Sequence, residues 1–392
     1  MTPSRLPALR REAWGSWPVE RSCHVGEGCC VLADDRGRNV DLSVVIPAFN
    51  SAPYLRSTLD ACALALGRTG WSAEVIVVDD GSTDGTGDLI EQWAGDFPVE
   101  LRVVRQSNKG RFLARWTGLE VATGGNVLLL DSRVILGPDV LRHIERSLTA
   151  NPARQVWNGH AITDPDAPLV GHFWEVPVHV FWGDFLGNPR PIEFGVDNFN
   201  RYPKGTGVFF APRQVLMDAC RDAWPEGDAA LASDDTKVIR GIAARHPIQL
   251  DPEFWATYRP RTNVRDFVRH SFGRGTFLVD SFGGTSAGWS IALLVLAVLP
   301  LALLAALVAV AVAAGWWAFG AVVAACLLAA CLPAAVAAVR GCPARGVLAY
   351  LVFLPVFVLP YWAGLVRGLV VHGARVFGRA PVPVASARGA EN

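Results

Sequence analysis

The C-terminal third of the chain contains a long stretch without charge. No Asp, Glu, Lys or Arg occurs between Trp289 and Val339, and Gly315 interrupts the apolar run near its middle. A helix needs roughly 20 apolar residues to cross the hydrocarbon core of a bilayer, and Trp289–Ala314 and Trp316–Val339 each meet that length. Two helices that are apolar on every side would have to be wrapped completely in a soluble protein. The pattern therefore predicts a membrane hairpin.

A third apolar segment, Val347–Val371, follows the hairpin. It is long enough to span, but Pro355 and Pro360 interrupt it and Arg367 lies inside it. Positively charged residues collect on the cytoplasmic side of membranes. A third full span would carry the arginines of the tail to the outside. We therefore favour a kinked, re-entrant or interfacial segment, with a third full span as the alternative.

Composition excludes some function classes. The 36 basic and 36 acidic residues cancel, so the basic footprint of a nucleic-acid-binding protein is absent. Residues 1–40 have no sustained periodicity and are predicted to be an extension, and no apolar segment follows their arginines as in a secretory signal. Cys23, His24, Cys29 and Cys30 cluster there. No second ligand pair follows at zinc-site spacing, so incidental thiols are favoured over a metal site.

Between the extension and the hairpin, short apolar runs alternate with helical periodicity. This alternation predicts an α/β domain with a parallel, doubly wound sheet. In such sheets ligands bind beyond the carboxyl ends of the strands, and Asn50, Asp80 and Asp131 follow three of those ends. The predicted strands are Leu42–Ile46, Glu74–Val78, Leu101–Val104 and Val127–Leu130, and the predicted helices are Tyr54–Leu66, a helix capped by Ser82 or Thr83 that runs to Trp93, and Gly110–Ala122.

Four sequence blocks in this region match a known family in order and spacing. They read LSVVIPAFN at 42–50, VVDDGSTD at 77–84, NKG at 108–110 continuing to Gly125, and LLLD at 128–131. Together they resemble the family 2 glycosyltransferases of GT-A fold. The resemblance implies a Rossmann-like, mostly parallel sheet. It implies a GT-A domain over 41–280, with a nucleotide-sugar half (41–145) and an acceptor half (146–280), before a membrane region (288–371) and a basic tail (372–392).

The resemblance also implies a donor site for a nucleotide sugar. Pro47 and Phe49 would border the nucleobase, and Asp80 would accept the N3–H of a uracil-type ring. A carboxylate at a strand end is well placed to accept a ring N–H, and an aromatic side chain offers a stacking face. Core packing is the alternative for Phe49, and a turn-forming role is the alternative for Asp80. The remaining implied donor residues are Asn50, Lys109, Asp131 and Arg133.

The fourth block departs from the family. The family's Asp-x-Asp, whose second carboxylate holds Mg²⁺ or Mn²⁺ against the diphosphate, reads Asp131-Ser132-Arg133 here. A guanidinium has no acceptor and cannot bind a metal, so only Asp131 keeps a ligand position. Either Arg133 neutralises the diphosphate directly, with little or no need for metal, or catalysis has been lost and a binding fold remains. We favour the first explanation.

The acceptor half carries a candidate general base. The block from Asp234 to Val238 resembles the family's Glu-Asp-x-x-Leu signature, which implies that Asp235 is the base, with Asp234 as the second choice. Inverting transfer needs a carboxylate that removes the proton of the acceptor hydroxyl. A carboxylate pair favoured by the helix dipole is the alternative. The implied acceptor residues are Gly205 and Thr206, in a strand block that resembles the family's, and Trp174, in an aromatic-rich stretch.

A basic run precedes the hairpin. The block from Arg269 to Gly275 resembles the family's Gln-x-x-Arg-Tyr-Gly-Arg-Gly region, without clean counterparts of its Gln and first Arg. It implies that Arg269, His270 and Arg274 lie near the diphosphate and the membrane. The alternative is binding of anionic lipid headgroups, worth about 1 kcal/mol per charge.

Together these features predict an inverting glycosyltransferase at the cytoplasmic membrane, with its catalytic domain in the cytoplasm. The donor would be UDP- or GDP-linked and the acceptor lipid-linked, as in bacterial exopolysaccharide-type transferases or a polyprenyl-phosphate sugar synthase. With at most three spans, a processive polysaccharide synthase is disfavoured. From a different class, the alternative is a catalytically impaired scaffold that binds nucleotide sugar in a glycan-assembly complex.

Overall fold

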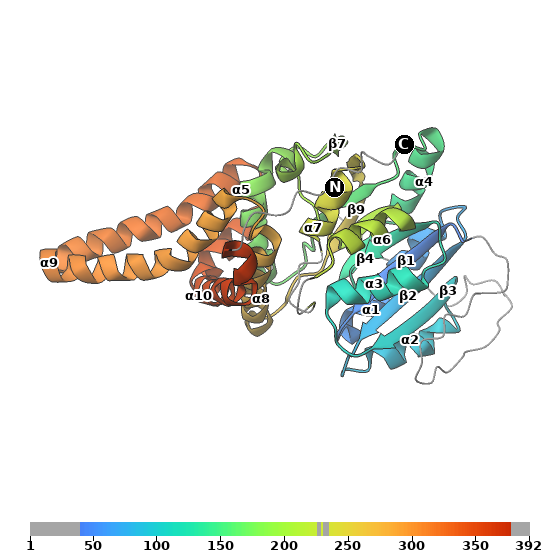
Figure 1. Ribbon diagram of the computed structural model, residues 1–392, viewed down its shortest axis with the longest axis horizontal. Helices are drawn as coiled ribbons and strands as arrows, with labels where there is room; N and C mark the ends of the chain where they lie inside the picture. Colours follow the sequence, from blue (N-terminus) through green and yellow to red (C-terminus); the bar gives the residue numbers. More distant parts are fainter. Residues whose placement is uncertain (1–39, 226–228, 230–234, 378–392) are drawn as a thin grey trace, which may run out of the picture.

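The structure, a computed structural model, describes residues 40–225, 229 and 235–377. An α/β domain runs to the end of helix α8 (Val264–Phe282), and two long apolar helices follow it (Figure 1). The cluster formed by Cys23, His24, Cys29 and Cys30 lies outside the described residues, as does Asp234. Their predicted roles stay predictions.

The first half of the domain follows the predicted alternation of strands and helices. Strand β1 pairs in parallel with β2 and with β4, and β2 pairs in parallel with β3. Except at the start of α2, the element ends lie within two residues of the prediction. The elements are β1 (Leu42–Ala48), α1 (Ala52–Leu66), β2 (Ala73–Asp80), α2 (Thr86–Ala94), β3 (Glu100–Gln106), α3 (Arg111–Val121) and β4 (Asn126–Leu130).

The prediction that Ser82 or Thr83 caps α2 is wrong. Gly85 precedes the helix instead, with a left-handed φ of 80°. The Ser82 hydroxyl accepts the Asn50 N–H at 2.9 Å, and the Thr83 N–H donates to the Asn50 side-chain oxygen at 2.8 Å. Both residues therefore join the loop after β2 to the loop after β1, and this occupies the groups that would have capped the helix.

The second half adds antiparallel strands to the same sheet, in the order β3-β2-β1-β4-β8-β6-β9-β5, with β7 on β9. Of the eight pairings among described residues, four are antiparallel, so the predicted mostly parallel sheet is wrong and the sheet is mixed. The elements are β5 (Val134–Leu136), α4 (Val140–Ala150), β6 (Trp157–Thr163), η2 (Leu169–Trp174), α5 (Glu175–Leu186), β7 (Ile192–Phe194), η3 (Phe199–Arg201), β8 (Val208–Pro212), α6 (Arg213–Asp222), α7 (Thr236–Ala243) and β9 (Ile248–Tyr258).

Both faces of the sheet are buried. Successive strand residues point to opposite faces, so Val44 and Ile46 pack with α1, α2 and α4, whereas Val45 packs with α3, α6 and α7. All seven residues of β1 are buried. This two-sided burial explains why the strand reads as a continuous apolar run, and it leaves the strand ends as the exposed edge where polar side chains can gather.

The predicted hairpin is present as helix α9 (Ala287–Val339). Gly315 breaks the helical conformation with φ 76° and ψ 178°, and the two legs run back beside each other (Figure 1). Helix α10 (Ala344–Phe377) follows. Within the described residues, α9 and α10 are the two helices long and apolar enough to cross a membrane, by length and composition alone.

Helix α10 differs from the predicted third segment in two ways. It passes through Pro355 and Pro360 as one helix, so the predicted kink is not shown, and it continues past residue 371, where the basic tail was predicted to begin. Its proline-containing part is held along its length by ring contacts, including those of Phe267 with Phe353 and Phe357. This packing supports a continuous helix in spite of the N–H groups that proline lacks.

Helices α8 and α10 pack so closely that their backbones are in contact. A Cβ atom on Gly364 would overlap the carbonyl oxygen of Phe272, and one on Gly275 would overlap the carbonyl oxygen of Tyr361. The Thr276 hydroxyl donates to the Gly364 carbonyl at 2.9 Å in the same crossing. Only glycine allows this approach, so the glycines fix how α10 packs against the α/β domain.

Replacing Gly364 by Ala is therefore expected to destabilise the protein by about 1–3 kcal/mol, the usual cost of overpacking. The thermal midpoint in detergent should fall. The matched control is Gly320→Ala in α9, where a Cβ meets nothing within 4 Å and Ala is the better helix former. Equal midpoints for the two variants would contradict the close crossing.

Candidate active site

The predicted donor residues gather at the carboxyl ends of neighbouring parallel strands. Asn50 lies beyond β1, Asp80 ends β2, and Asp131 follows β4. Asn50 has a φ of 48°, a left-handed conformation that is uncommon outside glycine. Its backbone N–H and its side-chain oxygen bind the loop after β2. The first two strand ends are thus held as one unit.

Asp80 holds the loop before α3. Its buried carboxylate accepts hydrogen bonds from the Gln106 side chain at 2.7 Å and from the backbone N–H groups of Lys109 and Gly110, both at 2.9 Å. A carboxylate offers about four acceptor positions, so one remains for a ligand. The local turn bond belongs to Asp79, whose carboxylate accepts the Ser82 N–H at 3.0 Å, so the turn-forming alternative for Asp80 is wrong. The role of Asp80 toward a nucleobase stays a prediction.

Phe49 is not a core residue. Its side chain is 49% exposed, whereas Pro47, two residues earlier, is buried within β1. The core-packing alternative for Phe49 is therefore wrong, and an aromatic face stands open beside the strand ends. Lys109 is also exposed, with its backbone held by Asp80.

Replacing Phe49 by Ala should weaken donor binding without unfolding the domain. Stacking of a base on an aromatic side chain is worth about 1–3 kcal/mol, which corresponds to a roughly 5- to 150-fold higher Kd. Titration calorimetry with UDP- and GDP-sugars measures this change. Phe181→Ala, at a side chain that is 71% exposed on α5, is the control and should bind like the wild type.

Asp131 and Arg133 point to different partners. The Asp131 carboxylate receives the buried Arg115 guanidinium at 2.6 Å, and its backbone N–H donates to the Gly207 carbonyl at 2.9 Å. The Arg133 guanidinium lies 3.8 Å from the centre of the Tyr54 ring, and it donates to the Pro260 carbonyl at 3.4 Å. The diverged motif thus places a carboxylate already bound to one arginine next to a second arginine.

The residues present do not fit a divalent metal. No group of three His, Cys, Asp or Glu side chains able to hold one occurs within 40–225, 229 and 235–377. Asp131 is paired with Arg115, whose positive charge would repel a cation. Metal dependence stays a prediction.

Asp235 begins α7 and caps it. Its carboxylate accepts the Thr236 N–H at 2.5 Å and the Thr236 hydroxyl at 3.0 Å. Burial lowers the pKa values of Arg115 and Lys204, and the negative charge of Asp235 offsets part of that lowering. Asp235 therefore lies on the same side of the molecule as Asp131. The helix-start role is present, and the role as base stays a prediction.

The predicted acceptor strand borders this site. The Gly205 N–H donates to the Asn158 side chain at 3.0 Å, and Thr206 is buried. A Cβ on Gly207 would stand 3.1 Å from Asp131. Lys204 is a residue that the sequence reasoning missed: burial lowers its pKa to about 8, and its ammonium donates to the Tyr202 carbonyl at 2.7 Å.

A basic cluster forms where three distant segments meet: Arg111, Arg133, Arg261, His270 and Arg274. Burial and the four arginines together hold the pKa of His270 well below its usual range. The Arg274 side chain donates to the His270 ring at 3.3 Å. Burial also lowers the pKa of Arg261, and Arg133 and Arg111 lower it further. One Arg261 nitrogen is buried without a hydrogen-bond partner among the described residues.

The basic cluster contains His270 and Arg274, two of the three residues predicted to lie near the diphosphate. Arg269 lies outside it, because its side chain is 72% exposed and its closest partner is Asp266, at 3.5 Å. Arg261 belongs to the basic run before the hairpin, whereas Arg111 was missed as a site residue, although it directly follows the Asn108-Lys109-Gly110 block. Arg274 lies over the Trp174 ring at 5.3 Å, and Trp174 also contacts Phe357 of α10 at 5.4 Å. The basic cluster therefore reaches the apolar helices.

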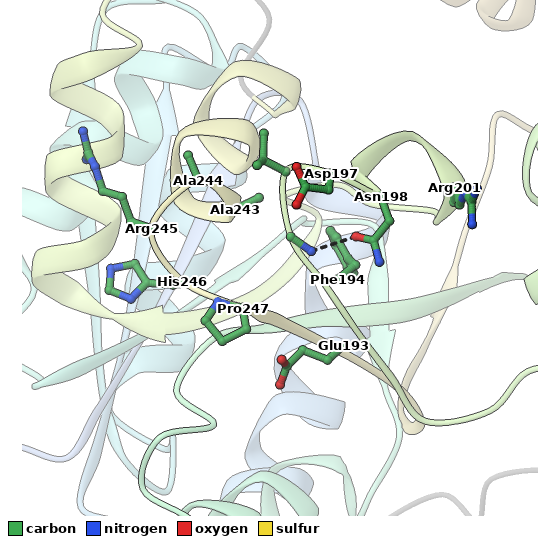
Figure 2. Close-up of a pocket in the computed structure, with 12 residues that line it drawn as sticks. Glu193, Phe194, Asp197, Asn198, Arg201, Ala243, Ala244, Arg245, His246 and Pro247 are labelled. Carbon is green, nitrogen blue, oxygen red and sulfur yellow. Dashed lines mark hydrogen bonds between the residues drawn. The ribbon is translucent and has the colours of Figure 1, made fainter. Parts of the chain in front are cut away.

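A surface cavity of about 640 Å³ lies elsewhere. Figure 2 shows its lining, which comes from β7, the loop after it, Arg201 of η3, and the end of α7 with the loop that follows. In the loop after β7 the Gly195 N–H donates to the Asn198 side chain. None of the residues predicted for the donor, base or acceptor lines it. The candidate active site is the strand-end edge with the basic cluster, rather than this cavity.

Comparisons with known proteins place residues 43–185 in the Glycosyl transferase family 2 model. The uncharacterized glycosyltransferase YibD of Escherichia coli is 37% identical over 23% of this chain and 25% of its own length. The putative teichuronic acid biosynthesis glycosyltransferase TuaG of Bacillus subtilis is 29% identical over 38% of this chain and 57% of its own. The chain thus spans between a quarter and about three fifths of these relatives.

Among solved structures, S. aureus TarS 1-349 in complex with UDP is 19% identical. The match covers 61% of this chain and 66% of that one, with a TM-score of 0.42, and a likeness this low says nothing about the ligands of this chain. The family model, the strand-end residues and the sequence relatives agree on one assignment. Residues 43–185 of this chain are similar to family 2 glycosyltransferases.

Proposed function

We propose that this protein transfers a sugar from a UDP- or GDP-linked donor to a lipid-linked acceptor at the cytoplasmic membrane face, with inversion. The observation that carries the proposal is the convergence of the strand-end residues and the basic cluster on one edge of the sheet, beside the apolar helices. The nucleobase would stack on Phe49 and bind the open acceptor position of Asp80. The relatives support this reaction class, since their names describe glycosyltransferases.

The diphosphate is neutralised by arginines in the proposed reaction. Arginine is always charged and binds phosphate oxygens through paired N–H groups. Arg133 occupies the position of the family's second Asp. The positive charges of Arg133 and Arg111 both act on Arg261, so the three side chains share one electrostatic environment. As the bond between the anomeric carbon and the diphosphate breaks, these side chains would stabilise the negative charge on the departing nucleoside diphosphate.

Asp235 is the proposed base. The acceptor hydroxyl attacks the anomeric carbon from the face opposite the diphosphate, which inverts that carbon, and its proton passes to the Asp235 carboxylate. Asp235 lies close enough to Asp131 and its partner for its charge to act on Arg115. Gly205, Thr206 and Trp174 would border the acceptor.

Membrane anchoring through α9 is part of the proposal. The Arg340 side chain, at the end of the hairpin, donates to the Val180 carbonyl of the catalytic domain at 2.6 Å. Arginine at this end agrees with a cytoplasmic domain under the positive-inside rule. A lipid-linked acceptor with a sugar hydroxyl, such as a polyprenyl-diphosphate-linked glycan, would reach the basic cluster from the same membrane surface.

The test uses the full chain purified in detergent, a panel of UDP- and GDP-sugars, and a polyprenyl-diphosphate-linked glycan, whose sugar hydroxyl is the acceptor. Mass spectrometry should detect this lipid carrying one additional sugar, formed from one donor of the panel. A second candidate function is a scaffold that binds nucleotide sugar, favoured by the capping bonds that already occupy Asp235. Donor binding without product or nucleotide release would replace the enzyme with this scaffold.

A further inference from the structure

We propose that α10 lies in the plane of the membrane as an interfacial helix, so that the lipid bilayer covers its outer face and the chain crosses the membrane only twice. The proposal rests on the proposed anchoring through α9. It decides between the interfacial segment and the third full span that hydropathy leaves open.

Both ends of α10 are tied to the catalytic domain. At the start, the Arg345 guanidinium donates to the carbonyls of Pro165 and Ala167, in the loop before η2. Near the end, His372 lies 3.7 Å from the buried Asp280 carboxylate, which binds Lys237 of α7 at 2.8 Å. A span would separate these ends by the roughly 30 Å of a hydrocarbon core. The domain that holds both ends would then have to lie inside the bilayer.

Helix α8 is the partner of α10 along this course. Phe272 and Gly275 meet α10 near Gly364, and further along α8 Asp280 meets His372, so the two helices run in the same direction. Since α8 continues directly from β9 of the sheet, α10 follows the surface of the catalytic domain. Figure 1 shows α9 projecting away from that domain, whereas α10 is foreshortened and remains at the base of the hairpin.

The outer face of α10 is an apolar stripe. Leu348, Val352, Leu359 and Val370 are 51%, 49%, 68% and 79% exposed, and their spacing puts them on one side of a helix. Tyr350 and Leu365, on the opposite side, are buried against the protein. Hydrocarbon is the occupant that suits this stripe, because the adjoining α9 is apolar on every side and only 6% buried in its most hydrophobic part.

The course of α9 indicates the direction of the membrane normal. Its first leg contacts α10 ten residues after its start, where the Trp362 side chain of α10 donates to the Ala297 carbonyl at 2.8 Å. At the far tip, Trp316 and Trp317 are 78% and 95% exposed, and tryptophan favours the membrane–water interface. The hairpin therefore runs from one interface to the other, and α10 stays at the interface on the domain side.

Cysteine labelling tests this topology in a cysteine-free background, with a membrane-impermeant maleimide on sealed vesicles of both orientations. A cysteine appended after Asn392 should be labelled from the same face as Glu253→Cys on the catalytic domain. Ala314→Cys, at the hairpin tip, should be labelled only from the opposite face. An appended cysteine that shares the face of Ala314→Cys would overturn the proposal.

Depth measurements give a second readout. Spin labels at Leu348 and Val370 are separated by about 33 Å along the helix axis at 1.5 Å per residue. An in-plane helix puts both labels at the same depth, whereas a spanning helix puts them at opposite interfaces. Depths that differ by most of the bilayer thickness would reject the interfacial position. Release of the chain from membranes by high salt would instead show that the anchoring through α9 is wrong.

Discussion

Replacing Asp235 by Asn is expected to lower turnover by about 10²-fold or more, the lower end of what a positioned general base contributes. Asparagine caps helices as well as aspartate does, so the bond to the Thr236 N–H and the start of α7 should survive. The substitution therefore removes the basic carboxylate and leaves the cap. Initial rates of nucleoside diphosphate release, with the thermal midpoint measured in parallel, test this expectation.

Asp139→Asn is the matched control, because Asp139 precedes α4 as Asp235 precedes α7, and its side chain is 62% exposed. It should keep wild-type turnover. Asp234→Asn distinguishes the two members of the acidic pair. Full activity of Asp235→Asn combined with loss in Asp234→Asn would move the role of base to Asp234, and full activity of both variants would exclude a carboxylate base in this pair.

The second large effect is expected at Arg133. Arg133→Met keeps a side chain that can pack on Tyr54, but it removes the guanidinium near the proposed diphosphate. Loss of one preorganised donor to a developing negative charge typically costs about 10²–10³ in kcat. The loss should appear in kcat, with a smaller change in donor Kd, because the charge on the leaving group grows in the transition state.

Arg56→Met is the control for this experiment, since Arg56 is an exposed residue of α1 that pairs with Asp60. Arg133→Asp goes further, because it restores the family's Asp-x-Asp with Asp131. That variant should be inactive in EDTA and regain part of its turnover with Mn²⁺. Wild-type kcat in Arg133→Met would contradict the neutralising role of this arginine.

The sequence predicts the first half of the domain well because the burial of each strand there is visible in its own run of apolar residues. A strand such as β1, which is covered on both sides, reads as an apolar run, and its end at Asn50 is marked by the change to polar residues. Strand direction has no such local signal. Strands β8 and β9 pair with partners far along the chain, so their antiparallel contribution to the sheet could not be predicted.

The candidate site also combines features that local sequence predicts with features that depend on tertiary packing. Asp80 and Asp131 follow predicted strands, so their place at one edge was predictable. The basic cluster is assembled by tertiary packing from Arg111, Arg261 and residues of α8, each of which is an ordinary surface-type residue in the sequence. Hydropathy predicts that α10 is apolar, but it cannot distinguish a spanning helix from one that lies along the membrane surface, because only tertiary contacts fix its two ends.

The central claim is that this protein, which is similar to family 2 glycosyltransferases over residues 43–185, is an active transferase that uses arginines in place of a divalent cation. The most direct measurement is nucleoside diphosphate release by the detergent-purified wild-type chain, with each UDP- and GDP-sugar, in EDTA and in Mn²⁺. The account predicts turnover with one donor that persists in EDTA and is lost in Asp235→Asn. Turnover that EDTA abolishes would contradict the role of the arginines, and no turnover with any donor under either condition would contradict the enzyme itself.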